Sequence, residues 1–506
     1  MNLASDPWLP TLTRDGMRTV GLVDALTADV GVLDISSGDP LEDAAIMRLL
    51  VACDIAAADA GISSAQWVDA HRDRFDLFDP VTPFWQHPRM AAFADDPKAS
   101  RPVAAGSYRL VGNGSTAAGD SHNEAGIVFT PAEAARMLLV RHMFSVGGIQ
   151  SFVASAFGKE PMSAKNAVGT SRGFVWVQGS TLLETLELSR PATGPVGTFH
   201  FSWPDGIAPA TVGEPEGMLD ALTWQARAIN LLRNADGMVD RVMICDGVRW
   251  PEPGHGTWTA HNDEQLIPHA TYIQRKASDP FTAQDVHVDR PVWRQLLTAW
   301  TTDGEPGLLG TDLGSGTIRM TGLGSFQARI DGAVTGSLPV PAFSREDGRR
   351  LLAAVTAGYS TVASTSGSLA HNRMSLGTDA LSKATTTVAT AGFKEAFGTI
   401  VTAAATATIS VDDACAAIAD IATRTSAELI SDVVRVDPVA AARTLTRPAK
   451  NAKPEAVPTP LPDSHAQSTK TKTKAAKKRA PVPESETVAP AAENALDQGS
   501  GQAALF

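Results

Sequence analysis

Gly322-Leu323-Gly324-Ser325-Phe326-Gln327-Ala328-Arg329-Ile330-Asp331-Gly332 is the stretch of sequence that most constrains the fold and function of this chain. Two glycines precede an aromatic residue, a glutamine and a short alternating run, and a third glycine closes the stretch. This pattern predicts a tight bend that leads into one strand of a β-hairpin. Such a hairpin would expose Gln327, whose neutral amide can press against a base pair without the cost of desolvating a charge. A glutamine that simply faces solvent is the alternative interpretation.

The residues before this stretch predict a large mixed α+β domain over residues 1–340. Pro40–Val51 begins with acidic residues and carries an apolar face, which is typical of a helix. Thr130-Pro131-Ala132-Glu133 has the N-cap, N1 proline and N3 glutamate that open a helix. Phe174–Val177 has the pattern of a strand, whereas Leu182–Leu188 fits either a strand or a helix.

The composition changes after Pro341, where long segments rich in Ala, Thr, Leu and Val begin. These segments cover about 345–365, 378–408 and 411–434, and Asp437-Pro438 opens a fourth. Four helical segments with short connections predict an antiparallel four-helix bundle over residues 341–448. The expected fold class is therefore α+β, with a mixed N-terminal domain followed by this bundle. Residues 449–506 are rich in Pro, Ala, Ser, Thr and Lys and are predicted to be a disordered tail.

Charge and cysteine content narrow the classes of protein to which the chain can belong. The formal net charge is −12, and the residues before Arg447 carry 34 basic against 49 acidic side chains. An acidic body argues against a protein that coats nucleic acid by itself, while it allows a few local basic contacts inside an assembly. The three widely spaced cysteines fit neither a zinc site nor a disulfide framework, which suits a reducing cytoplasm. The sequence also predicts neither a signal peptide nor a membrane span.

Signatures of catalysis are nearly absent from the sequence. The chain has no Walker P-loop, no His-Glu-x-x-His, no Gly-x-Ser-x-Gly and no dinucleotide-binding glycine fingerprint. The best metal-like group is His255, His261 and His269, with Asp263 among them. Its spacings match no familiar ligand pair, so exposed loop histidines are the favoured interpretation. A metal-assisted hydrolase that uses these histidines remains the enzymatic alternative.

Several landmarks occur in an order that resembles CasA, the large subunit of the type I-E CRISPR surveillance complex Cascade. They are Asn2-Leu3-x-x-Asp6-Pro7-Trp8-Leu9-Pro10, Phe75-Asp76-Leu77-Phe78 through Pro83-Phe84-Trp85-Gln86, Thr130 through Arg136, Trp176-Val177-Gln178-Gly179-x-x-Leu182-x-Glu184-Thr185-Leu186, and Gly322-Leu323-x-x-x-Gln327-Ala328. Each landmark is degenerate, but the ordered combination is specific. The resemblance spans residues 2 to about 330, the helical segments to about 446 fit the family's C-terminal bundle, and the tail lies outside it.

The resemblance implies a non-catalytic subunit, without cofactor or metal, that acts in antiviral defence in the cytoplasm. This family scans duplex DNA for a protospacer-adjacent motif, mostly from the minor groove, and wedges the duplex open so that guide RNA can pair with the target strand. The protein thus reads a short motif and base pairing reads the rest, a division of labour known from another CRISPR effector. The implied partners are guide RNA, the other Cascade subunits, double-stranded target DNA and a recruited helicase–nuclease.

The resemblance also assigns residues to the DNA-motif site. Gln327 falls on the family's wedge glutamine, with Phe326 and Ala328 beside it on the hairpin. Phe326 stands where relatives carry a polar amide, so we expect a different motif preference. The family's glycine-containing loop corresponds to the region of Gly158 and Lys159, and its minor-groove basic residue corresponds to Arg241. A surface-strand arginine is the alternative interpretation of Arg241.

Two further groups of residues are expected to contact nucleic acid or other subunits. The docking loop near the guide RNA is assigned to Arg109–Asn123, with Arg109, Asn113, Ala117 and Ala118 as its candidates, although Ala117 and Ala118 stand where the family carries a Leu-Phe pair. Arg349, Arg350 and Lys383 on the predicted bundle are candidates for contact with the displaced DNA strand. A solvated helix face explains these three equally well. A scaffold subunit without motif recognition is the remaining functional alternative.

Overall fold

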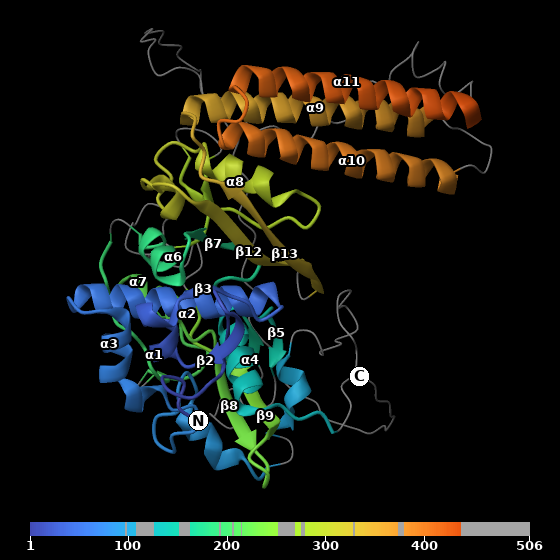
Figure 1. Ribbon diagram of the computed structural model, residues 1–506. Coiled ribbons are helices and arrows are strands. Elements are labelled where there is room, and N and C mark those ends of the chain that lie inside the picture. Colours follow the sequence, from blue (N-terminus) through green and yellow to red (C-terminus); the bar gives the residue numbers. More distant parts are fainter. Residues whose placement is uncertain are drawn as a thin grey trace, which may run out of the picture. The chain divides into compact units, whose positions relative to one another are not determined.

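The computed structural model describes residues 1–96, 99–107, 126–150, 162–191, 194–204, 207–213, 215–250, 269–274, 279–326, 329–372 and 379–436. The predicted tail, 449–506, and the predicted fourth helix from Asp437 lie outside these residues. The described residues all belong to one unit, Met1–Pro460. Their architecture is mixed α+β, with several small antiparallel sheets followed by long C-terminal helices (Figure 1), which confirms the predicted fold class at this level.

Strands and helices alternate along most of the chain. The strands are β1 (Leu9–Thr13), β2 (Gly16–Val20), β3 (Val32–Ile35), β4 (Arg101–Pro102), β5 (Gly148–Gln150), β6 (Met162–Ala164), β7 (Gly173–Gln178), β8 (Arg227–Arg233), β9 (Val239–Asp246), β10 (Tyr272–Ile273), β11 (Thr282–Ala283), β12 (Thr317–Phe326) and β13 (Arg329–Pro339). The α-helices are α1 (Leu22–Ala25), α2 (Pro40–Asp59), α3 (Ser64–Ala70), α4 (Pro131–Phe144), α6 (Leu182–Leu188), α7 (Met218–Leu222), α8 (Val292–Trp300), α9 (Arg345–Asn372), α10 (Asp379–Ala405) and α11 (Val411–Val436). Short 3-10 turns cover Ala28–Val30, Arg72–Phe75, Pro88–Phe93, Val103–Gly106 and Leu308–Gly310.

The strands form small sheets rather than one continuous layer. Three sheets have three strands each, in the orders β2-β1-β3, β13-β12-β7 and β4-β9-β8. Two more sheets, β5-β6 and β10-β11, have two strands each, and the strand pairs of all five are antiparallel. No helix in the described part of the chain is long and apolar enough to cross a membrane.

Helix α2 runs through the largest apolar core, and its start follows from its first residues. The Asp39 side chain accepts a hydrogen bond from the Leu41 backbone N–H at 2.9 Å, and Pro40 occupies the first turn, where no N–H donor is needed. Most side chains from Leu41 to Ala57 are buried, and α2 packs against α3, α4 and α7. The predicted helix is therefore confirmed.

Helix α4 packs on α2 and begins at the predicted capping box. The Thr130 hydroxyl accepts a hydrogen bond from the Glu133 N–H, and the Glu133 carboxylate accepts one from the Thr130 N–H at 2.7 Å. The strand prediction around Phe174 is confirmed by β7. The ambiguous segment after Gly179 forms helix α6, because Thr181 caps its first turn.

Three long helices, α9, α10 and α11, cover the predicted C-terminal segments (Figure 1). Ser344 caps α9 together with Asp347, as the sequence indicates. These helices share one apolar core with α8 and with the β13-β12-β7 sheet, so packing continues across residue 340. The predicted domain boundaries at 340 and 448 stay predictions, as does the four-helix count.

The β12–β13 hairpin is present, but the sequence prediction misplaced its bend. Gly322 and Gly324 lie inside β12, opposite Val334 and Gly332, and the chain reverses between Phe326 and Arg329, which face each other. The glycines therefore serve close packing and not a turn. A Cβ atom on Gly322 would lie 2.6 Å from the Arg172 carbonyl oxygen. One on Gly324 would lie 2.4 Å from Val288 Cγ1.

We expect Gly322→Ala to lower the free energy of unfolding by roughly 1–3 kcal/mol, because neighbouring backbone must shift to admit the new methyl group. Gly392→Ala is the matched control. Gly392 is exposed on α10, and a Cβ atom there meets nothing within 4 Å, so this change should be neutral or slightly stabilising. Urea denaturation of both variants measures the difference. Equal stabilities would contradict the close-packing explanation.

Candidate nucleic-acid interface

The β12–β13 hairpin extends beyond its third strand. Strand β7 pairs with β12 from Thr317 only as far as Gly322, which faces Gly173. From Leu323 to Phe326, β12 keeps β13 as its only partner strand within the described sheets. Opposite Gly324 and Ser325, strand β13 holds one extra residue, Asp331, and this bulge interrupts the register and increases the local twist of the hairpin. The end of the hairpin therefore points in a different direction from the strands of the sheet to which it belongs.

A short segment, Ala167–Arg172, lies against the free edge of β12, and we call it the strap. Thr170 forms a parallel bridge with Leu323, and the Ser171 N–H donates to the Leu323 carbonyl at 3.0 Å. The Ser171 hydroxyl lies 2.7 Å from the Ser325 hydroxyl, and it also donates to the Ser325 carbonyl at 3.3 Å. The strap therefore occupies the edge that β7 leaves uncovered.

The other end of the strap is fixed to the C-terminus of α4. The Gly169 N–H donates to the Met143 carbonyl at 2.9 Å, and the Thr170 hydroxyl donates to the Ser145 carbonyl at 2.8 Å. Carbonyls at the end of a helix lack intrahelical donors, so the strap satisfies groups that would otherwise be unpaired. On its second edge, the Ser171 carbonyl accepts a hydrogen bond from the Val286 N–H at 2.8 Å.

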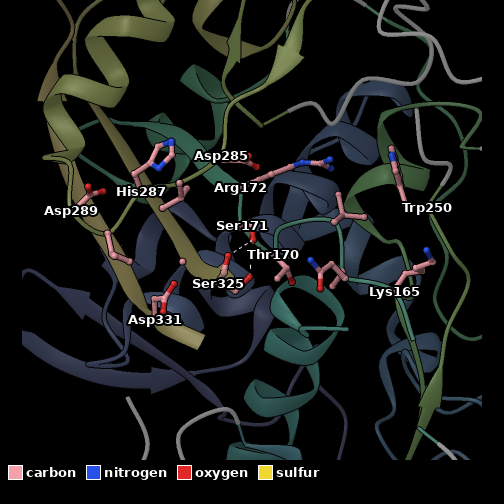
Figure 2. Close-up of a pocket in the computed structure, with 16 residues that line it drawn as sticks. Lys165, Thr170, Ser171, Arg172, Trp250, Asp285, His287, Asp289, Ser325 and Asp331 are labelled. Carbon is pink, nitrogen blue, oxygen red and sulfur yellow. Dashed lines mark hydrogen bonds between the residues drawn. The ribbon is translucent and has the colours of Figure 1, made fainter. Parts of the chain in front are cut away.

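The strap, the hairpin and the segment after Gln284 enclose a groove of about 600 Å³ (Figure 2). Lys165 and Trp250 lie on one side of the view, whereas His287 and Asp289 lie on the opposite side. The charged and titratable side chains of the lining are Lys165, Arg172, His287, Asp285, Asp289 and Asp331. Three carboxylates accompany the two cations Lys165 and Arg172, so the groove differs from the uniformly positive track that follows a phosphate backbone.

Arg172 contributes a guanidinium group to the lining of this groove. Its guanidinium makes no hydrogen bond or ion pair with the residues that the structure describes. The side chain is half-buried, and its backbone is bridged to Asp285 on one side of the strap. A guanidinium in this position can donate to an incoming ligand without first giving up a protein partner.

Most of the predicted motif-site residues fall outside the described residues. Phe326 ends β12, and Gln327 and Ala328 are the two undescribed residues that join β12 to β13. Gly158 and Lys159 belong to the undescribed connection 151–161 between β5 and β6. Lys165, at the groove, directly follows β6.

Arg241 is described and does not line the groove. It lies on β9, where its guanidinium donates to the Ala94 carbonyl and to the Ser100 hydroxyl, both at 3.2 Å. These contacts hold it against the segment before β4. Its assignment to the minor groove stays a prediction.

The remaining candidates are paired with carboxylates or are not described. Arg349 pairs with Asp303 at 2.8 Å, and Arg350 pairs with Asp347 and Asp412. Lys383 lies on α10, and its side chain is outside the described part. The docking-loop candidates Arg109, Asn113, Ala117 and Ala118 are likewise outside it.

The histidine group behind the enzymatic alternative is represented only by His269, since His255 and His261 are not described. The His269 ring is buried against Phe174, and its Nε2 lies 2.9 Å from the Ser189 carbonyl, so this nitrogen carries the proton. Burial lowers the pKa of His269 to about 4. Within the described residues, no group of three or more His, Cys, Asp or Glu side chains could hold a metal ion.

The strap has no signature in the local sequence. Ser171 and Ser325 are 154 positions apart, so no local periodicity connects them. The small residues Gly169, Thr170 and Ser171, with Gly173 soon after, are the one signal that could have indicated a segment packed tightly between other elements.

Comparison with known proteins identifies the family. A family model described as CRISPR-associated protein Cse1 matches residues 2–410, which is most of the chain. The chain belongs to the Cse1 family. Cse1, also called CasA, is the large, non-catalytic subunit of the type I-E Cascade surveillance complex, so the resemblance inferred from the landmarks is confirmed. This membership removes the hydrolase alternative.

Individual relatives agree with this assignment. CasA/Cse1 of Thermus thermophilus is 29% identical over 265 residues, which cover 47% of this chain and 50% of that protein. The match therefore spans about half the length of this curated relative. Cse1 of Thermobifida fusca has 18% identity with a TM-score of 0.68, over 89% of this chain and 94% of that chain. A chain of a CRISPR RNA-guided surveillance complex has 19% identity with a TM-score of 0.66, over 88% and 98%. At these identities the two structures show the Cse1 fold.

Proposed function

We propose that this Cse1 chain recognises a protospacer-adjacent motif in duplex DNA and wedges the duplex open to start R-loop formation. The observation that carries the proposal is the β12–β13 hairpin, which extends past β7 and lines an open groove with Gly324, Ser325 and Asp331. In the sequence, the neutral pair Gln327 and Ala328 joins its two strands. Membership of the Cse1 family supports the same role.

The charge pattern fits a short local contact with DNA. A neutral side chain can enter between base pairs with a smaller desolvation cost than a charged one, so a glutamine suits a wedge. The mixed charge of the groove would repel a long run of phosphates, whereas its polar groups can meet base edges and sugars. Motif reading by the hairpin, Gly158, Lys159 and Arg241 therefore belongs to this proposal.

The partners of the chain are part of the proposal as well. We infer that it assembles with guide RNA and the other Cascade subunits, binds double-stranded target DNA and helps to recruit the helicase–nuclease. The loop that contains Arg109, Asn113, Ala117 and Ala118 would dock near the guide RNA. Contact of the displaced strand with Arg349 or Arg350 would require DNA to displace their carboxylate partners, so these contacts are expected to be weak. A fourth helix after α11 would complete the predicted bundle.

The direct test is the variant Gln327→Ala in a guide-loaded complex. Strand opening of a motif-bearing duplex should slow, while the variant chain folds and assembles as before. Opening at the unaltered rate would remove the wedge assignment and leave a scaffold role.

Arg172 gives a second prediction within the same proposal. Arg172→Ala should weaken binding of the guide-loaded complex to motif-bearing duplex by about 1–3 kcal/mol, because the groove loses a guanidinium that has no partner among the described residues. If the guanidinium meets a phosphate, the slope of log K against log salt should also fall by roughly one. A salt titration by mobility shift measures both quantities.

The control for Arg172 is Arg18→Ala. Arg18 is exposed on β2 and pairs with Asp15 at 2.9 Å, away from the groove. This variant should bind DNA like the unaltered chain. Equal losses in both variants would mean that the effect reflects net charge and not the groove.

A further inference from the structure

The end of the β12–β13 hairpin depends on the strap for its support. Beyond Gly322, strand β12 has no strand of the described sheets on its outer edge, and the strap covers that edge instead. The backbone of the strap reaches Leu323. Only the Ser171 side chain, among the described contacts of the strap, reaches further along β12, to Ser325. Ser325 lies two residues before Gln327.

The contact lies opposite the bulge at Asp331 of β13. The register of the hairpin shifts between Gly324 and Ser325, so the direction of the last residues of β12 is set at this point. Bulges commonly re-aim a strand near a functional site. The Ser171 hydroxyl bonds both the hydroxyl and the carbonyl of Ser325, so the β12 residue opposite the bulge is held at two atoms (Figure 2).

The strap is itself held in an unusual conformation. Ser171 has a φ of 62°, in the left-handed region that residues with a Cβ atom rarely adopt. Such a conformation persists only where the surroundings over-determine it. Here the Ser171 N–H and carbonyl are bonded to Leu323 and Val286 on opposite sides, and the α4 end holds Gly169 and Thr170. A rigid support is thus built next to the hairpin.

We propose that Ser171 is a positioning residue, whose hydroxyl fixes the aim of the hairpin tip toward duplex DNA. The inference rests on the proposed wedge function and deepens it. Ser171 does not need to touch DNA, because it acts through Ser325 and the bulge on the residues at the tip. The tip then meets the first base pair from a fixed direction and loses less conformational freedom when it inserts.

The informative variant is Ser171→Gly. Glycine adopts a positive φ without strain, so the strap can keep its backbone while the hydroxyl is lost. In a guide-loaded complex, the rate of strand opening on an intact motif-bearing duplex should fall roughly fivefold, the effect expected for one lost side-chain hydrogen bond. The rate on a target whose first base pairs are mismatched should not change, since no wedge is needed there. Ser325→Ala should give the same pattern, with thermal unfolding measured for each variant.

Combination with Gln327→Ala separates positioning from folding. If Ser171 acts through the tip, Ser171→Gly should add no further slowing in the Gln327→Ala background. The same fivefold loss in that background, or an equal loss on the mismatched target, would overturn the inference. If Ser171→Gly opens the duplex at the unaltered rate while Gln327→Ala is slow, the positioning role of Ser171 is overturned and the proposed wedge function stands. An unaltered rate in Gln327→Ala itself would instead remove the proposed function.

Discussion

Gln327→Ala should slow R-loop formation on an intact motif-bearing duplex by roughly thirtyfold. Separation of a stacked base step costs a few kcal/mol, and a side chain that inserts there offsets part of that cost. Loss of about 2 kcal/mol of this support in the transition state corresponds to the stated factor. The residue joins β12 to β13 at the end of the hairpin, so its truncation leaves the described core contacts unchanged. Fluorescence of a base analogue at the first target position reports the rate of opening.

Two controls accompany this measurement. A duplex whose first base pairs are mismatched needs no wedge, so wild type and variant should open it equally fast. Asp236→Ala, in the exposed β8–β9 turn, is the matched change at another hairpin and should leave the rate unaltered. A thirtyfold loss on the mismatched duplex would show that Gln327 supports binding and not strand separation.

The second large effect is loss of stability in acid, which three buried histidines cause. Burial lowers the pKa of His142 to about 3, and it lowers the pKa of His87 and of His269 to about 4. His142 donates from Nε2 to the Trp85 carbonyl at 2.8 Å, and its lowered pKa keeps the buried ring neutral in the folded chain at neutral pH. The unfolded chain binds these protons near pH 6.5. It therefore holds more protons than the folded chain between about pH 6.5 and pH 4.

Because the unfolded chain binds more protons than the folded chain in this range, acid favours unfolding. Stability falls as the pH falls. Between pH 7 and pH 5, each of these histidines should lower the free energy of unfolding by about 2 kcal/mol. Glu305 acts in the opposite direction, since burial raises the pKa of its carboxyl to about 8, and its contribution to stability grows as the pH falls from about 8. The net loss is therefore smaller than the sum over the histidines.

Variants resolve the two contributions. His142→Gln keeps a donor for the Trp85 carbonyl and should reduce the loss between pH 7 and pH 5 by about 2 kcal/mol. Glu305→Gln should make the acid loss larger by removing the compensating group. Urea denaturation of the chain at pH 7, 6 and 5 provides these values. An unchanged pH dependence in His142→Gln would mean that His142 binds its proton in the folded chain as readily as in the unfolded one.

Local sequence signals predicted the elements that local chemistry determines. The capping box at Thr130 and Glu133 fixes the start of α4, and Pro40 after Asp39 fixes the start of α2. Such signals lie within four residues of the feature they determine, so a single sequence carries them. The three C-terminal helices were predictable for the same reason, although α9 extends to Asn372 and so outlasts its apolar pattern.

The candidate site was only partly predictable because its parts are brought together by tertiary contacts. The glycines at 322 and 324 suggested a bend, but their neighbours in space, the Arg172 carbonyl and Val288, make close packing their actual role. Gln327 was found through the family landmarks and a hairpin pattern. Ser171 and Arg172 follow no motif, because their importance arises from contacts with β12 and the groove.

We propose above all that this chain gives the surveillance complex its preference for a DNA motif. The most direct measurement is selection from duplexes that carry one target and a randomised flank, with guide-loaded complex assembled with and without the chain. We expect a flanking motif to be enriched only when the chain is present, and the enrichment to weaken in Arg172→Ala. Equal recovery of all flanks by both preparations would contradict the claim and would identify the chain as a scaffold subunit.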